Sequence, residues 1–172
     1  NNLVVSNQRV CINQNLNLTA TGGTNYSWTG PNGFISIQQN PSISNVNTSH
    51  SGQYICIISG TGGCNITNTV TIQIQNTTAP TGNANQSFCS RQNATVADII
   101  TNGTNVIWYN SATNTTPLAN TTLLTNNTTY YATQTINSCE SANRLAVTIS
   151  LINTLNATNY SEIICGNLND AT

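Results

Sequence analysis

Residues 51–59 read Ser-Gly-Gln-Tyr-Ile-Cys-Ile-Ile-Ser, with aromatic or apolar side chains at every second position, at Tyr54, Cys56 and Ile58. A period of two places these three side chains on one face of a β-strand, because successive side chains point to opposite faces. The β-branched residues between them also favour a strand. This stretch therefore predicts a strand with one face in an apolar core.

Similar short runs extend in both directions from this strand. They are rich in Val, Ile, Thr and Tyr and are separated by clusters of Asn, Gly and Pro, which is typical of short strands joined by turns. The apolar spacing of an amphipathic helix is missing. The expected strands are 3–6, 16–20, 26–29, 34–38, 42–46, 53–59 and 68–75, followed by 95–99, 105–109, 118–124, 129–135 and 145–151. The predicted fold class is all-β.

The sequence also repeats itself. The segment 7–11 (Asn-Gln-Arg-Val-Cys) recurs as 85–89 (Asn-Gln-Ser-Phe-Cys), and a third copy, 161–165, again ends on a cysteine. Two further pairs recur in the same order, Trp28 with Trp108 and Cys64 with Cys139. We therefore expect two complete structural units and the opening of a third.

A segment without alternation separates the first two repeats. It contains Pro80 and Gly82, which end strands. The expected organisation is repeat 1 at 1–76, a linker at 77–82, repeat 2 at 83–151, and the incomplete beginning of repeat 3 at 152–172.

Charged residues make up only 4% of the 172 residues, and the formal net charge is −1, whereas a soluble domain usually carries about 25%. Three cations cannot neutralise a phosphate backbone, so no nucleic-acid partner is expected. Because no apolar run is long enough to span a bilayer, no direct membrane insertion is expected either. Asn and Thr supply about a third of the chain, but aromatic and β-branched residues are frequent enough to build a core.

Around Trp28 and Tyr54 the first repeat resembles an immunoglobulin domain. Tyr26-Ser27-Trp28 falls where that family has the buried Trp of its third strand, and residues 51–56 match the later strand in which Tyr precedes Cys by two positions. The family's usual Asp before Ser-Gly is replaced by His50. The resemblance implies a β-sandwich with Trp28 and Tyr54 in its core.

The whole chain resembles the tandem immunoglobulin-like repeats of giant secreted adhesins of Bacteroidetes, among them gliding-motility surface proteins exported by the type IX secretion system. In the second repeat the residues that carry the resemblance are 88–89, 94–98, 107–109, 117–118, 129–132, 139–141 and 144–148. This resemblance implies two tandem immunoglobulin-like sandwiches plus the start of a third, with Trp108 and Tyr131 in the second core. It also implies an extracellular location on a bacterial cell surface.

Six cysteines in a repeated register indicate an oxidising compartment. Because neighbouring copies should share one framework, the register predicts two disulfides, Cys11 with Cys64 and Cys89 with Cys139. Cys56 stands at the position of an immunoglobulin's second cysteine, so a Cys11–Cys56 bond is an open alternative. Cys165 has no local partner.

Residues capable of catalysis or metal binding are few and scattered: Asp98, Glu140, Glu162, Asp170 and His50. Such a set predicts no enzyme, no metal site and no cofactor. Trp28, Trp108 and Tyr109 are the candidates for a sugar-binding platform, but both Trp residues recur at the core position of the repeat, which favours packing between sheets.

The leading functional hypothesis is therefore a spacer, or stalk, of a long secreted cell-surface adhesin, whose partners are neighbouring repeats of the same chain. The alternative is an adhesive module that binds surface glycans, or another surface protein, through loop Asn, Thr and Tyr side chains. A third hypothesis is a pair of accessory domains on a secreted hydrolase.

Overall fold

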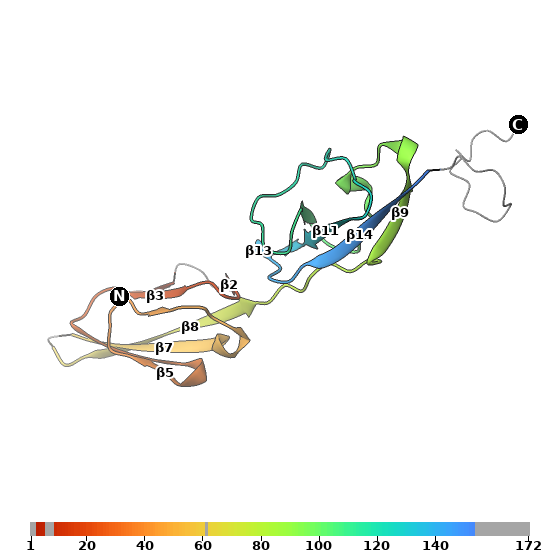
Figure 1. Cartoon of the computed structure of the whole chain (residues 1–172). Helices are drawn as coiled ribbons and strands as arrows, with labels where there is room; N and C mark the ends of the chain where they lie inside the picture. The colour runs from red at the N-terminus through yellow and green to blue at the C-terminus, as the bar shows by residue number, and fades with distance from the viewer. Residues whose placement is uncertain (1–2, 6–8, 61, 154–172) are drawn as a thin grey trace, which may run out of the picture. The chain divides into compact units, whose positions relative to one another are not determined.

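A computed structural model of the chain describes residues 3–5, 9–60 and 62–153. Two compact units are formed (Figure 1). Of the described residues, unit 1 comprises those up to Thr77 together with Asn137–Glu140, and unit 2 comprises Thr78–Ile136 and those from Ser141 onward. The predicted third repeat, 152–172, lies outside the described residues except for positions 152 and 153, and Cys165 lies outside them as well.

Unit 1 is a two-layered β structure. A three-stranded sheet has the order β1 (Leu3–Val5), β3 (Leu16–Ala20), β6 (Ser42–Ile43), and a five-stranded sheet has the order β2 (Arg9–Cys11), β8 (Asn65–Gln75), β7 (Gly52–Ser59), β4 (Asn25–Gly30), β5 (Phe34–Ser36). Figure 1 shows β7 and β8 side by side as the long strands of the larger sheet. The all-β prediction is confirmed.

The core of unit 1 is built on the alternation seen in the sequence. Tyr54, Cys56 and Ile58 of β7 are buried, and Trp28 of β4 lies opposite Cys56. Trp28 is fully buried, and its Nε1 donates a hydrogen bond to the carbonyl oxygen of Gln38 at 3.0 Å. Apolar burial of this kind contributes about 2 kcal/mol or more per large side chain.

A glycine makes room for the Tyr54 ring. A Cβ atom at Gly30 would overlap the Tyr54 side chain, so the ring packs directly on the backbone of β4. Between β4 and β5 the chain turns through a short 3₁₀ segment, Pro31–Gly33, where Asn32 and Gly33 adopt φ values of 57° and 71°. Asn and Gly tolerate this left-handed region best, which is why the turn forms there.

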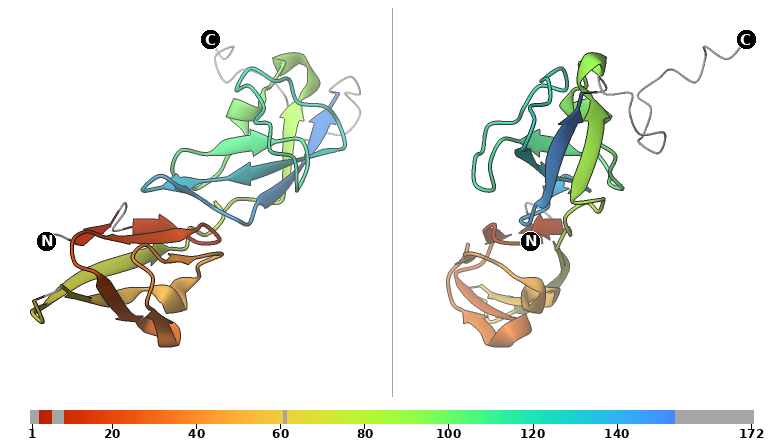
Figure 2. Two further views of the ribbon diagram at one scale, coloured as in Figure 1. Left: turned by 90° about the vertical axis from the view of Figure 1, so that its left-hand side faces the viewer. Right: turned by 45° about the vertical axis from the view of Figure 1, so that its right-hand side comes forward.

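Unit 2 contains one four-stranded sheet of order β10 (Ile107–Tyr109), β11 (Thr128–Thr133), β14 (Leu145–Ile152), β9 (Asn85–Cys89). A two-stranded hairpin, β12 (Thr135–Ile136) and β13 (Cys139–Glu140), follows β11. The long segment between β10 and β11, residues 110–127, forms no extended strand and curves as a loop in both views of Figure 2.

Two strands predicted for this repeat do not form. Residues 95–99 contain a 3₁₀ turn instead, Val96–Asp98, because the Asp98 carboxylate accepts hydrogen bonds from the backbone N–H and the hydroxyl of Thr95. Residues 118–124 make only the isolated bridge Thr95↔Leu123. Val96 and Leu124 are nevertheless buried, so the apolar pattern was correct about burial and wrong about backbone conformation.

The strand register also corrects one core residue. Trp108 pairs with Ala132, and Tyr130 pairs with Val147, so these side chains share the face that forms the second core. Tyr131 pairs with Tyr109 on the other face and is only half-buried. The buried ring of β11 is therefore Tyr130 and not Tyr131.

The same register shows how the two units correspond. Trp28 lies opposite Cys56 in unit 1, and Trp108 lies opposite Ala132 in unit 2. Tyr54 and Tyr130 each stand two positions before that partner. In both units a short strand that ends on a cysteine pairs in parallel with the last long strand, β2 with β8 and β9 with β14.

Candidate functional site

The described cysteines form a disulfide that the sequence did not predict. Cys11, the last residue of β2, is bonded to Cys139, the first residue of β13, with Cα atoms 5.4 Å apart and a sequence separation of 128. The predicted pairs Cys11–Cys64 and Cys89–Cys139, and the alternative Cys11–Cys56, are therefore wrong. In the chain-entropy treatment, closing a loop of this length stabilises the folded state by about 5 kcal/mol.

A tight hairpin presents Cys139 to its partner. Asn137 and Ser138 connect β12 and β13 and have φ values of 51° and 65°, the combination that a two-residue hairpin turn requires. At the base of the hairpin Ser141 donates its backbone N–H to the carbonyl of Gln134 at 2.9 Å. Although Cys139 falls within the second repeat of the sequence, Asn137–Glu140 belongs to unit 1, which explains why repeat register misassigned the bond.

The other described cysteines differ in state. Cys56 is a buried free thiol and Cys64 an exposed one, whereas Cys89 is disulfide-bonded. Burial raises the pKa of the Cys56 thiol above its ordinary value, against a smaller lowering by a backbone hydrogen bond from Ser27. In unit 2, Ala132 occupies the place of Cys56, so this position is a packing position in both units.

The one histidine of the chain has a structural role. The Nδ1 atom of His50 accepts the backbone N–H of Asn47 at 3.1 Å, while the Asn47 side chain accepts the N–H of Ser49 at 3.0 Å. These bonds close a capping box around the turn Thr48–His50. His50 therefore acts as a turn residue at the position where the Asp of the family would stand.

Arg144 also serves its own domain. Its Nη1 and Nη2 atoms donate to the carbonyl oxygens of Ser111 and Asn114, both at 2.7 Å, and its guanidinium lies 3.7 Å from the centre of the Tyr109 ring. One side chain thus holds the end of β10 and the loop that follows it. Tyr109 is buried beneath this contact and offers no platform for a sugar ring.

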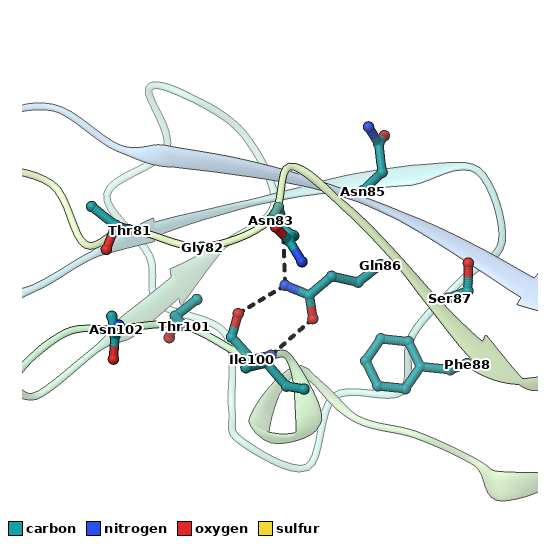
Figure 3. A pocket seen from close by; sticks show the side chains of 10 residues that line it. All are labelled: Thr81, Gly82, Asn83, Asn85, Gln86, Ser87, Phe88, Ile100, Thr101 and Asn102. Carbon is teal, nitrogen blue, oxygen red and sulfur yellow. Dashed lines mark hydrogen bonds between the residues drawn. The ribbon is translucent and has the colours of Figure 1, made fainter.

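Unit 2 carries a pocket of about 490 Å³, shown in Figure 3. Its lining residues are uncharged: Thr81, Gly82, Asn83, Asn85, Gln86, Ser87, Phe88, Ile100, Thr101 and Asn102. Thr81, which precedes β9, forms an isolated bridge with Asn102, and a few residues later β9 pairs with β14 instead. The pocket lies where the chain changes from the first partner to the second.

The Gln86 side chain spans this opening (Figure 3). Its Oε1 accepts the backbone N–H of Ile100 at 2.9 Å, and its Nε2 donates to the carbonyl oxygens of Ile100 and Asn83 at 2.8 and 3.3 Å. A side-chain amide thus replaces the backbone pairing that is lost at the opening. The lining offers neutral hydrogen-bonding groups and one half-buried ring, Phe88.

Within residues 3–5, 9–60 and 62–153 no three His, Cys, Asp or Glu side chains lie close enough to hold a metal ion. Asp98 is engaged by Thr95, which lowers the pKa of its carboxyl below the ordinary value of 3.8 through the backbone and then the side-chain hydrogen bond. Among the helices of the described part, none is long and apolar enough to cross a membrane.

Comparison with known proteins agrees with this architecture. Residues 2–74 match the family described as "Immunoglobulin domain", and residues 78–152 match "Ig-like domain CHU_C associated". No curated protein matches the chain.

Two solved structures align with most of this chain. The three N-terminal domains of the Highly Immunogenic Outer Capsid protein of bacteriophage RB49 align over 87% of this chain and 58% of theirs, with a TM-score of 0.54 and 10% identity. Murine CEACAM1b aligns over 86% of this chain and 98% of its own, with a TM-score of 0.40 and 13% identity. The chain thus spans a little over half of the phage fragment, and at 10% identity the likeness to that fragment shows the fold alone.

Proposed function

Because the chain consists of two tandem immunoglobulin-like domains, we propose that it is a spacer segment of a long secreted bacterial surface protein, of the adhesin type found in gliding bacteria. Its task in this proposal is to hold a terminal binding domain away from the cell. Each domain is then a unit of length, and neighbouring repeats of the same chain are its natural partners.

The observation that carries the proposal is the reuse of one plan in both units. Each unit has a buried Trp, and a Tyr stands two positions before the residue that pairs with this Trp on the neighbouring strand. Each unit also has a short strand that ends on a cysteine and pairs in parallel with the last long strand. The ionic side chains Arg144 and Asp98 and the imidazole of His50 are bonded within their own domains. What is common to both units is thus structural.

The bacterial and extracellular parts of the proposal have separate support. The match of residues 78–152 to a CHU_C-associated domain accords with the resemblance to Bacteroidetes repeats, and the disulfide fits an oxidising exterior. Because only 4% of the residues of the chain are charged, salt-dependent forces between neighbouring stalks are limited. Export by the type IX system is part of the same proposal.

Length scaling tests the spacer function. Head-to-tail fusions of one, two and three copies of the full chain are compared by small-angle X-ray scattering, and a spacer requires the maximum dimension to rise in proportion to copy number. The same proteins are applied to glycan and surface-protein arrays, where no saturable binding is expected. A maximum dimension that does not grow, or saturable binding by the single copy, contradicts the proposal.

The uncharged pocket of unit 2 favours a second candidate, recognition of a neutral surface glycan. Hydroxyl and amide side chains at Thr101, Asn102 and Asn85 can hydrogen-bond sugar hydroxyls without ion pairs. In this case a glycan array gives saturable binding that Asn85→Ala and Thr101→Val each weaken at least fivefold. The exposed Asn120→Ala change, outside the pocket, is the matched control and leaves binding unchanged.

A further inference from the structure

We propose that the Cys11–Cys139 disulfide is a mechanical bypass: tension applied through the ends of the chain runs across this bond and leaves the residues between the two cysteines unloaded. The inference starts from connectivity. Cys11 ends the second strand of unit 1, and Cys139 lies beyond β12, at a sequence separation of 128. The bond therefore encloses β3 to β8, the link at Thr77, and unit 2 as far as β12.

Covalent connectivity decides which residues carry a load. A stretched chain transmits force along its shortest covalent path, and here that path passes from Cys11 directly to Cys139. The two Cα atoms are 5.4 Å apart, whereas the backbone between them, if extended, measures roughly 420–460 Å at 3.3–3.6 Å per residue. About three quarters of the 172-residue chain is thus removed from the tensile path.

The strands that remain in the path are themselves well anchored. On the N-terminal side β2 pairs in parallel with β8, with Arg9 opposite Gln73, Val10 opposite Ile74 and Cys11 opposite Gln75. On the C-terminal side the path enters β14, which is hydrogen-bonded to β11 along one edge and to β9 along the other. The load is therefore received by strands with several hydrogen bonds each.

The Cys11–Cys139 bond shields residues of both repeats from tension, whereas a bond inside one repeat would shield that repeat alone. A Cys11–Cys64 bond would have shielded the body of the first repeat alone and left the linker at 77–82 and all of the second repeat under tension. Cys11–Cys139 encloses the linker as well. Both domains can lose their folded structure under force without a large gain in length.

The physiological meaning of the bypass rests on the proposed spacer function, since a spacer is pulled through its ends when a tip is bound. The bypass itself follows from the bond and can be measured independently. A failed force experiment would leave the scattering test of the spacer untouched, and a failed scattering test would leave the bypass standing.

Single-molecule force spectroscopy on the full chain, held between marker domains, tests the proposal. Cys89, which is in a disulfide of its own, is replaced by Ser in every protein compared, so that the Cys11–Cys139 bond is the difference. We expect the oxidised parent to gain about one quarter of the contour length gained by the variant with Cys11→Ala and Cys139→Ala. The control variant with Cys56→Ala and Cys64→Ala keeps the small gain of the parent, because both thiols are free.

Reduction under load supplies a second measurement that does not depend on the variant folding. The oxidised parent is held at constant force and dithiothreitol is added; its two thiols become a cyclic disulfide while Cys11 and Cys139 each take up one hydrogen as thiols. A further lengthening of roughly 420–460 Å is expected at that moment. Equal contour gains in parent and variant together with no lengthening on reduction overturn the proposal, as does peptide mapping that finds Cys11 and Cys139 unpaired.

Discussion

The hydroxyl of Tyr54 donates a hydrogen bond to the backbone carbonyl of His50, four residues upstream, at 3.0 Å. This bond joins the start of β7 to the capped turn before it, and the ring is fully buried, which raises the pKa of the phenol. Tyr54→Phe leaves a carbonyl without its donor and is expected to lower the free energy of unfolding of unit 1 by about 1 kcal/mol in urea titration.

The chain supplies a matched control for this prediction. The Tyr26 hydroxyl also donates to a carbonyl four residues upstream, that of Gly22, at 2.7 Å, but Tyr26 is only half-buried. Tyr26→Phe is expected to cost less than half as much, because water can replace the lost donor. Equal losses for the two variants would show that burial does not decide the value of this bond.

Thiol labelling distinguishes the two free cysteines. Cys64 is exposed, whereas burial withdraws Cys56 from reagent and raises the pKa of its thiol, so less thiolate forms at neutral pH. We expect maleimide to modify Cys64 within minutes and Cys56 only after denaturation, as read by peptide mass mapping. Comparable labelling of both peptides in the native protein contradicts the structure around β7.

One buried hydroxyl has no hydrogen-bond partner among the described residues. Thr77 is 4% exposed, and its Oγ1 is unpaired there. Thr77→Val keeps the shape and removes the unpaired group, so it is expected to raise the free energy of unfolding by about 1 kcal/mol. Thr148→Val is the control, since Thr148 Oγ1 lies 2.9 Å from Thr129 Oγ1, and its loss should destabilise.

The sequence predicted the first unit well because its strands alternate strictly. Tyr54, Cys56 and Ile58 carry the period of two that the structure shows on β7. The apolar residues at 95–99 predict a strand, whereas the structure has a 3₁₀ turn at Val96–Asp98, because the apolar pattern indicates burial and does not fix the backbone conformation. The signal was present, since Thr95 and Asp98 have the spacing of a capping box.

The disulfide and the second core needed information that one sequence does not contain. Tyr130 and Tyr131 are adjacent, so only the register with Val147 decides which ring faces the core. The Cys11–Cys139 bond depends on which unit receives Asn137–Glu140, a matter of tertiary packing. The pocket at Gln86 arises because a strand changes partners, which no local pattern signals.

Replacing Arg144 tests the clamp on the loop after β10. Arg144→Lys keeps the charge but loses the two parallel donors to Ser111 and Asn114 and the planar contact with Tyr109. Unit 2 should lose about 2 kcal/mol of unfolding free energy, with amide exchange of residues 110–117 accelerated. Arg9→Lys, at an exposed site, should change stability by less than about 0.5 kcal/mol.

Acid titration tests how much the Asp98 carboxylate stabilises the turn Val96–Asp98, which forms in place of a predicted strand. The pKa of Asp98 is lower in the folded chain than its ordinary 3.8, because the backbone N–H and hydroxyl of Thr95 bind the charged form. The stabilisation from a lowered pKa is fully present at a pH above the pKa of the unfolded state. It is lost as the pH falls through the pKa of the folded state. Unit 2 should therefore weaken as the pH drops below about 4. Asp98→Asn keeps an acceptor oxygen for Thr95 but cannot titrate, so the stability of unit 2 in this variant should change less with pH over the same range.

The indole N–H signal of Trp108 reports unit 2 separately from Trp28 during urea titrations at pH 6, 4, 3 and 2.5. The same acid dependence in the parent and in Asp98→Asn would show that another carboxyl group governs the acid stability of this unit.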